Sequence, residues 1–276
     1  MSPEGRPLPP RVQKYLADLG LGSRREIEGW IRAGRVAIDG RVVRLGERAP
    51  PEATIHLDGR PVGRAAAASP RVLLYHKPPG ELSARSDPRG RRLVFDRLPK
   101  LPEGRWVMVG RLDYATEGLL VFTTEGAWAH ALMHPRNGVP RRYAVRVCDA
   151  LSDEDIRRLL AGVRLEDGRA SCTGLVPLGG RGRNRWYALE VHEGRNRLVR
   201  RLFEAVGHPV GRLVRTAYGP LVLPPSLRRG QTRELESEEV AVLAERLAAL
   251  PVPPPAPGKD RPKEKDLSSG RGRRPR

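Results

Sequence analysis

The chain has 276 residues, which is enough for one large domain with its own hydrophobic core and a smaller module. Its 51 basic and 32 acidic side chains give a formal charge of +19, which favours a polyanion such as nucleic acid as the partner over a membrane surface. There is no run of about eighteen apolar residues, no signal-peptide core and no Cys-x-x-Cys pair, so we expect a cytoplasmic protein without a membrane span, a disulfide framework or a zinc site.

A small module with helices and short strands is predicted over residues 11–63, after a flexible start at 1–10. Apolar residues recur with helical spacing over 12–19, and a glycine ends this helix. Ser23 and Glu26 form the S-x-x-E pattern of a capping box, which predicts a second helix. Aspartate-glycine turns between short apolar runs predict hairpins, with strands at 36–38, 42–43 and 55–57 and turns at 39–40 and 58–59.

Residues 64–70 lack an amphipathic pattern and are predicted to link this module to a larger domain at 71–250. In that domain, strand-like and helical segments follow one another in mixed order, without regular strand–helix–strand units. Such an order favours an α+β fold built on a mixed, mostly antiparallel β-sheet. The expected strands are 72–75, 107–109, 119–122, 143–147 and 186–191, and the expected helices are 126–133, 152–161, 196–206 and 236–249.

The C-terminal residues 251–276 are predicted to be a disordered basic tail. Residues 251–257 contain five prolines, and residues 258–276 hold eight basic and three acidic side chains without apolar periodicity. Without this tail the rest of the chain still has a formal charge of +14, so the positive field is expected to belong to the fold as well.

Asp113 lies in the segment VGRLDYATEGLLVFTT, residues 109–124, between two strand-like runs. A single aspartate can act as a nucleophile or a general base, whereas glycoside hydrolysis usually needs a second acid flanking the bond. Glu117 follows four residues later, but in a turn nothing obliges both carboxylates to face one substrate. Taken alone, the segment favours a structural turn or cap for Asp113.

A helix predicted to start near Asn196 has an apolar stripe with Arg200 and Arg201 on its two flanks. An arginine beside a buried stripe can reach a partly buried carboxylate and hold it ionised, with a pKa below about 3.9. Taken alone, the pattern is more typical of arginines that solvate a helix or bind phosphate.

Tyr143 follows Arg141 and Arg142 at the head of a predicted strand. An aromatic ring beside two cations can stack on an unpaired base while the arginines bind the RNA backbone. A tyrosine on a strand is, however, more often part of a hydrophobic core.

His130 and His134 are spaced to share one helix face, as metal ligands can be, but no third ligand is in view and Pro135 ends the helix. The glycine-rich stretch 179–183 matches neither a phosphate-binding loop nor a dinucleotide fingerprint, and it is predicted to be a flexible basic loop. We therefore expect neither a metal nor a nucleotide cofactor.

Taken together, these motifs resemble those of the bacterial ribosomal RNA pseudouridine synthases that carry an N-terminal S4 RNA-binding domain. The resemblance covers nearly all of residues 11–245, in the family's order. Segments within 87–99 and 162–168, with the basic tail, look most like the large-subunit enzymes, and the small-subunit enzymes are the closest competitor. The motifs are 11–17, 23–25 and 34–36 for the S4 domain, and Lys77-Pro78-Pro79-Gly80, Gly110-Arg111-Leu112-Asp113 with Thr116, Gly118, Leu119 and Leu120, Arg142-Tyr143, and 193–202 for the catalytic domain.

The resemblance implies an S4 RNA-binding domain at 11–63 and a catalytic domain at 71–250 that converts uridine to pseudouridine without a cofactor or metal. Asp113 would be the catalytic carboxylate, either attacking the ribose or taking its C2′ proton. Arg200 would pair with Asp113 and keep it ionised, and Tyr143 would stack on the target base. The residues expected to contact RNA are Arg111, which would fill the vacancy left by the base or hold phosphate, and Lys14, Arg24, Arg25, Arg35, Lys77, Arg142, Asn196 and Arg197.

The resemblance favours 23S ribosomal RNA near the peptidyl-transferase centre as the substrate, as free RNA or in an assembling subunit, and a monomeric protein. His76 and Leu198 depart from the family pattern and bear on which RNA is chosen. Two alternatives stay open, namely modification of 16S ribosomal RNA and a non-catalytic RNA-binding or ribosome-assembly role. A single-carboxylate hydrolase is disfavoured because no second acid has a clear role.

Overall fold

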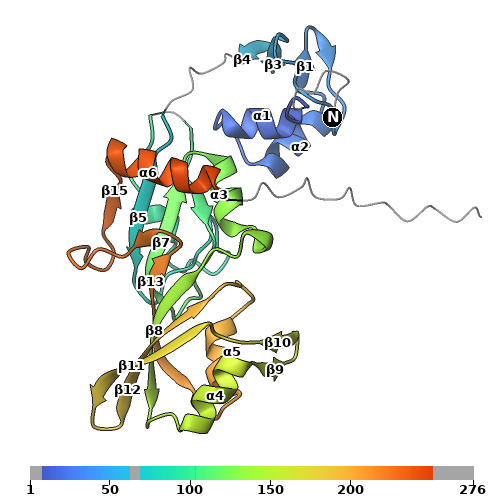
Figure 1. Ribbon diagram of the computed structural model, residues 1–276. Helices are drawn as coiled ribbons and strands as arrows, with labels where there is room; N and C mark the ends of the chain where they lie inside the picture. Colours follow the sequence, from blue (N-terminus) through green and yellow to red (C-terminus); the bar gives the residue numbers. More distant parts are fainter. Residues whose placement is uncertain (1–7, 63–68, 103, 251–276) are drawn as a thin grey trace, which may run out of the picture.

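The structure is a computed structural model that describes residues 8–62, 69–102 and 104–250 (Figure 1). The predicted tail at 251–276, and most of the predicted N-terminal segment and linker, lie outside the described residues. No helix within the described ranges is long and apolar enough to cross a lipid bilayer.

The N-terminal module packs two helices against a small antiparallel sheet, as the sequence predicts. Its elements are α1 (Val12–Asp18), α2 (Arg24–Arg32), β1 (Val36–Ile38), β2 (Arg41–Val42), β3 (Ile55–Leu57) and β4 (Arg60–Val62), in the strand order β2-β1-β3-β4. Ser23 and Glu26 form the predicted capping box of α2. Asp39 and Asp58 take positive φ in the two predicted hairpin turns, a conformation that aspartate tolerates better than most residues.

The larger domain is built on a nine-stranded sheet within the described residues. It contains β5 (Val72–Lys77), β6 (Val107–Val109), β7 (Glu117–Thr123), β8 (Arg141–Cys148), β11 (Gly174–Arg181), β12 (Asn184–Val191), β13 (Val210–Tyr218), β14 (Leu221–Val222) and β15 (Thr232–Glu234). The order is β11-β12-β8-β13-β7-β5-β15, with β14 beside β13 and β6 beside β7. Pairings are antiparallel except that β13 runs parallel to β7, so the predicted α+β fold with a mixed, mostly antiparallel sheet is confirmed.

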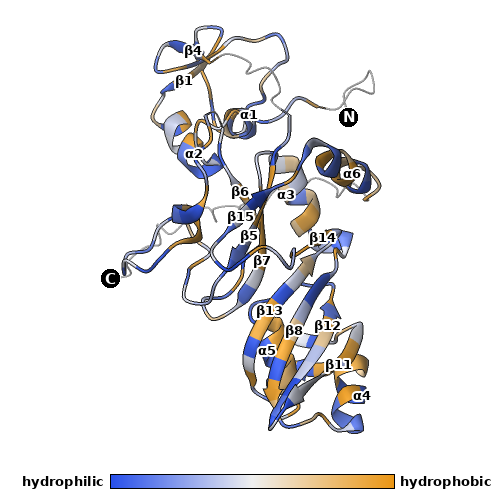
Figure 2. Cartoon of the chain, turned by 90° about the vertical axis from the view of Figure 1, so that its left-hand side faces the viewer, coloured by the Kyte–Doolittle hydropathy of each residue, from blue (hydrophilic) through white to orange (hydrophobic). Residues whose placement is uncertain are grey.

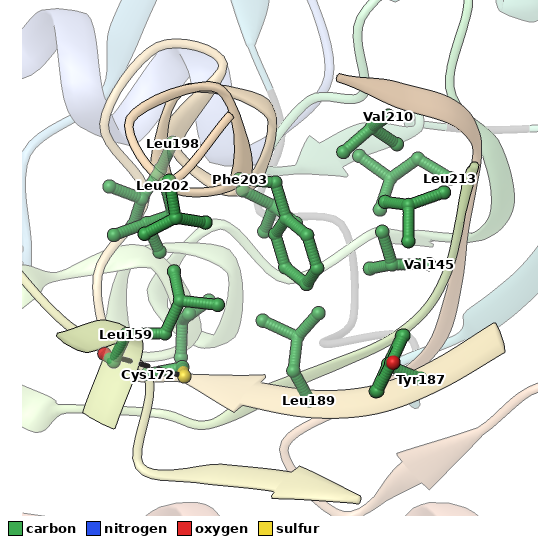
Figure 3. Close-up of a cluster of buried hydrophobic side chains, with 14 of the residues drawn as sticks. Val145, Leu159, Cys172, Tyr187, Leu189, Leu198, Leu202, Phe203, Val210 and Leu213 are labelled. Atoms are coloured by element: carbon green, nitrogen blue, oxygen red, sulfur yellow. Dashed lines mark hydrogen bonds between the residues drawn. The ribbon is translucent and has the colours of Figure 1, made fainter. Parts of the chain in front are cut away.

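Helices cover the two halves of this sheet separately (Figure 1). The remaining elements are α3 (Gly126–Met133), α4 (Asp153–Ala161), α5 (Leu198–Glu204), α6 (Ser237–Ala248), the 3-10 turns η1 (Val94–Arg97) and η2 (Pro135–Asn137), and a hairpin of β9 (Val163–Leu165) and β10 (Gly168–Ala170). α3 and α6 share a core with β5 and β7 that includes Leu74 and Val121. α4 and α5 share a core with β8, β12 and β13, in which Phe203 lies near Val145 and Leu213 (Figure 3).

The sheet has two faces because successive residues of a strand point in opposite directions. We call the face that bears Tyr143 the cleft face, and the face that bears Arg142 and Ala144 the back face. On the cleft face, Tyr143 packs on the α4–α5 core and on a second core around Phe122. On the back face, α3 and α6 cover Val121 and its neighbours in the β5–β7 half of the sheet.

Two sequence predictions need correction, and some strands, β13 among them, were not predicted. The stretch 179–183 is not a loop throughout, because β11 continues to Arg181 and a Cβ at Gly180 would overlap the backbone of the opposing β12. The helix expected from 196 begins at Leu198, since Arg197 before it has a left-handed backbone with φ 49°. β13 was not predicted, because a charged residue, Arg215, interrupts its inward-facing apolar positions.

Candidate active site

A cavity of about 910 Å³ opens on the cleft face where β7 and β13 run side by side. Asp113 and Arg111 border it from the loop before β7, and Tyr143 borders it from β8. Asn196 and Arg197 border it from the segment before α5. The fold therefore brings together five of the predicted site residues from three distant segments of the chain.

Asp113 lies in a tight turn, as its local sequence indicates, and it borders the cavity. The backbone N–H of Thr116 donates to the carbonyl of Asp113 at 3.0 Å. Ser83 holds the other side of the turn, because its hydroxyl donates to the carbonyl of Leu112 at 2.8 Å and accepts from the N–H of Leu112 at 3.2 Å. Asp113 is partly exposed, so a ligand in the cavity can reach it.

Arg215 is a buried cation beside the cavity that the sequence pattern did not identify. Its Nε donates to the carbonyl of Leu119 at 2.8 Å, and its Nη1 donates to the carbonyl of Arg111 at 3.4 Å. Gly118 lets β13 come this close, since a Cβ there would overlap the backbone of Arg215. Arg215 thus ties β13 to the segment that carries Asp113, and its inward position on an alternating strand is the signal that could have identified it.

Lys77 is completely buried, with 0% of its surface exposed, so the prediction that it contacts RNA is wrong. Its Nζ donates to the carbonyls of Pro78 and Thr116, both at 2.9 Å, and to that of Tyr114 at 3.4 Å. Burial lowers the pKa of Lys77 to about 8, although nearby carboxylates including Asp113 act to raise it. Lys77 therefore holds the Asp113 loop in place instead of binding phosphate.

Arg200 is mostly buried, but it does not form the expected ion pair with Asp113 within the described part of the chain. Its Nη1 donates to the carbonyl of Val210 at 2.8 Å, and its Nη2 donates to the carbonyl of Ala115 at 3.3 Å. Burial lowers the pKa of Arg200 and the charge of Arg197 lowers it further, while the charge of Asp113 raises it. The prediction of an ion pair is therefore corrected. Arg200 interacts with the charge of Asp113 without contact, and it donates a hydrogen bond to the turn that contains Asp113.

Tyr143 and Arg142 point to opposite faces of the sheet because they are neighbours on β8. Tyr143 borders the cavity on the cleft face. Arg142 points to the back face, where its Nε donates to the carboxylate of Glu190 at 2.8 Å. The expectation that Arg142 holds the RNA backbone beside a base stacked on Tyr143 is therefore wrong.

The rim of the cavity offers three exposed polar side chains, those of Arg111, Asn196 and Arg197. Arg195, in the same segment, lies 2.8 Å from Glu193 and 2.9 Å from Asp167 in ion pairs. These ion pairs fix the backbone that presents Asn196 and Arg197, so the rim is well placed to contact an RNA backbone.

The four RNA-contacting residues expected in the N-terminal module differ in their surroundings. Lys14 and Arg35 are each in an ion pair with an aspartate at 2.6 Å, which partly neutralises their charge. Arg24 and Arg25 are exposed at the start of α2, and no ion pair involves them among the residues that the structure describes. Arg24 and Arg25 are therefore the stronger candidates for phosphate contacts.

Glu117 does not share the cavity with Asp113. It is 4% exposed on the back face, where Arg212 and Arg229 donate to its carboxylate at 2.9 and 2.6 Å and Nε2 of His76 lies 3.3 Å away. Burial raises the pKa of Glu117, but the hydrogen bonds from Arg229 and Arg212 outweigh this effect and lower it. Glu117 therefore joins strands and does not act as a second acid for Asp113.

His130 and His134 lie near the end of α3 with their ring centroids 5.2 Å apart. Nδ1 of His134 accepts a hydrogen bond from the backbone N–H of Arg136 at 3.3 Å, so this ring caps the turn that follows. Over residues 8–62, 69–102 and 104–250, no group of three or more His, Cys, Asp or Glu side chains is arranged to hold a metal ion.

Comparisons with known proteins agree with this fold. The family model described as RNA pseudouridylate synthase matches residues 71–205, and the S4 domain model matches residues 10–55. A Pseudomonas aeruginosa protein named ribosomal large subunit pseudouridine synthase B is 48% identical over 249 residues, which are 89% of this chain and 64% of that protein. The protein of the same name from Escherichia coli K12 is 50% identical over 245 residues, 87% of this chain and 84% of that protein. A crystal structure of pseudouridylate synthase has the same fold, with a TM-score of 0.59 and 24% identity over 85% of this chain and 99% of the other.

Proposed function

Because the chain belongs to the RNA pseudouridylate synthase family and carries an S4 domain, we propose that it isomerises uridine to pseudouridine in large-subunit ribosomal RNA, near the peptidyl-transferase centre. The observation that carries this proposal is the 48–50% identity, over most of the chain, to relatives named as large-subunit enzymes. Two further observations support the proposal: a ligand in the cavity can reach Asp113, and the strong positive charge of the protein favours RNA as that ligand.

In this proposal Asp113 acts on the ribose of the target uridine. It either attacks C1′ or removes the C2′ proton, and both routes break the bond between N1 and C1′. The freed uracil turns and its C5 forms a bond to C1′; this step releases Asp113 from C1′ in the first route and returns the proton from Asp113 to C2′ in the second. C5 then loses its proton and N1 gains one. The product is an isomer of the substrate, so the reaction consumes no co-reactant.

Tyr143 and Arg111 are proposed to stabilise the RNA after the target base has left its stack. Flipping a uridine costs about a few kcal/mol and least at an unpaired or weakly paired site. Tyr143, in the cavity wall, stacks on the uracil, while Arg111 at the rim fills the vacancy or holds a phosphate. Asn196 and Arg197 contact the neighbouring backbone.

Mapping pseudouridines across both ribosomal RNAs, in cells with and without this gene, tests the proposal. The expected result is the loss of pseudouridine from 23S RNA near the peptidyl-transferase centre. A loss confined to 16S RNA would instead support the small-subunit alternative. If no pseudouridine is lost from either RNA, the result would support the non-catalytic RNA-binding role.

Arg200→Ala is expected to lower the single-turnover rate roughly 10- to 100-fold while RNA affinity stays nearly constant. The reason is that Arg200 donates to the Asp113 turn, and a hydrogen bond from a charged donor contributes about 1.5–3 kcal/mol. Single-turnover tritium release from RNA labelled at uracil C5, beside a binding isotherm, separates the two quantities. Arg201→Ala, which removes a neighbouring arginine paired with Asp167, is the matched control. A fall in affinity with an unchanged rate would contradict the assigned role.

Deleting residues 251–276 is expected to weaken RNA binding and flatten its salt dependence without removing turnover. The tail carries eight basic and three acidic side chains, and each phosphate contact adds about 0.7–0.9 to the slope of log affinity against log salt. Binding measured over a range of salt concentrations checks this. Equal slopes with and without the tail would mean that it makes no phosphate contacts.

A further inference from the structure

Half of the back face carries no helix among the residues that the structure describes. α4 and α5 pack on the cleft face of β11, β12, β8 and β13. The back face of the same strands is turned toward the viewer in Figure 2, and no helix of the described residues lies in front of it. We call this surface the open face; it is formed by Val176, Trp186, Ala188, Glu190, Arg142, Ala144, Arg146, Arg212 and Val214.

Cross-strand pairing arranges the open face in three rows. The first row holds Trp186, Arg146 and Arg212, from three adjacent strands. The third row holds Glu190 opposite Arg142. The middle row consists of small or β-branched residues, namely Val176, Ala188, Ala144 and Val214. The open face is therefore a shallow floor with polar side chains along two sides.

The first row combines an aromatic ring with two cations. The guanidinium groups of Arg146 and Arg212 lie 5.9 and 5.7 Å from the centroid of the Trp186 ring, and Trp186 is partly exposed. Arg212 also pairs with Glu117, whereas no ion pair involves Arg146 within the described part of the chain. Arg146 therefore has a charge available for an anion next to a ring available for stacking.

We propose that the open face binds a single-stranded segment of RNA, with a base stacked on Trp186 and a phosphate group at Arg146. Bases stack on aromatic rings and guanidinium planes, cations follow the phosphates, and the small residues of the middle row let a base lie flat. A sheet with helices on one side and an aromatic residue on its open side is an established architecture for this task. The proposal rests on the proposed function, because it takes RNA to be the ligand of the protein.

The open face and the cavity must take different segments of one RNA. Tyr143 points to the cleft face, while its neighbours Arg142 and Ala144 point to the back face, so the sheet itself separates the two surfaces. The cations of the open face make an acidic ligand favourable, and they disfavour the basic tail at 251–276 as its occupant. A second copy of the chain is the occupant that the experiment must distinguish from RNA.

The test uses the full chain and a labelled oligoadenylate of about ten nucleotides, which contains no uridine and so is not a substrate. Fluorescence anisotropy is expected to show about tenfold weaker binding for Trp186→Ala and near-normal binding for Trp186→Phe, which keeps a stacking surface. Arg146→Ala is expected to reduce the slope of log affinity against log salt by about 0.7. Arg157→Ala is the matched control, since this exposed arginine lies on α4 on the other side of the sheet.

Thermal unfolding by circular dichroism first confirms that the variants are folded. Wild-type affinity and salt slope in both Trp186→Ala and Arg146→Ala would overturn the proposal, as would a wild-type dimer that dissociates in Trp186→Ala. Tritium release from ribosomal RNA, measured on the same preparations, reports the proposed function separately. If the wild type releases tritium normally and the variants bind oligoadenylate as the wild type does, only the open-face proposal is refuted. If the wild type releases no tritium and the variants bind oligoadenylate more weakly, only the proposed isomerisation is refuted.

Discussion

Asp113→Asn is expected to reduce turnover by more than about 10³-fold while RNA affinity stays close to that of the wild-type protein. Asparagine keeps the shape of the side chain but can neither attack the ribose nor accept its C2′ proton. The turn should persist, because Ser83 and Thr116 hold it through backbone groups of Leu112 and Asp113. Affinity rests on arginine and lysine contacts to phosphate, which the substitution leaves in place.

The measurement is tritium release from ribosomal RNA labelled at uracil C5, together with a binding isotherm for the same RNA. Asp153→Asn is the matched control, because this aspartate is exposed at the start of α4 and away from the cavity. The control should retain full turnover. Turnover that survives in Asp113→Asn would contradict the assignment of Asp113 as the catalytic carboxylate. A loss of RNA binding would indicate a structural role for Asp113 instead.

Local features of this fold were predictable from the sequence because neighbouring residues determine them. The capping box of Ser23 and Glu26 and the turns at Asp39 and Asp58 depend on residues within one turn of each other. The turn at Asp113 is equally local. That this turn opens into a cavity depends on β13, which is almost a hundred residues further along the chain, so no local pattern could reveal it.

The surroundings of individual cations were the least predictable part of the site. Lys77 belongs to a recognisable motif, but its burial follows from the packing of the Asp113 loop over β5. The direction of Arg142 depends on which face of β8 is covered by helices, and sequence alternation does not specify this. Arg200 reaches the turn through Ala115 and not through Asp113, because its position is set by the contact of α5 with β13.

Lys77→Met is expected to lower turnover and to remove a pH dependence of stability. The pKa of Lys77 in the folded protein is about 8, against an ordinary value of 10.5. Below pH 8 the lysine is charged in both states, and the folded state carries the full penalty of burying that charge. Between pH 8 and 10.5 the unfolded chain still binds a proton that the folded chain has lost, so the stability of the wild type rises with pH. This lowering of the pKa corresponds to roughly 3 kcal/mol gained relative to Lys77→Met, which has no group to titrate there.

Denaturant unfolding of both proteins between about pH 7 and pH 11 measures this difference, and groups that titrate equally in both proteins cancel. Lys100→Met, which removes an exposed lysine, is the control and should leave the pH dependence unchanged. Turnover should fall in Lys77→Met because the carbonyls of Pro78 and Thr116 lose their donor and the Asp113 loop is less constrained. A stability difference that stays constant with pH would mean that Lys77 is not buried as a titrating cation. Full turnover in the variant would mean that its hydrogen bonds are not needed to position Asp113.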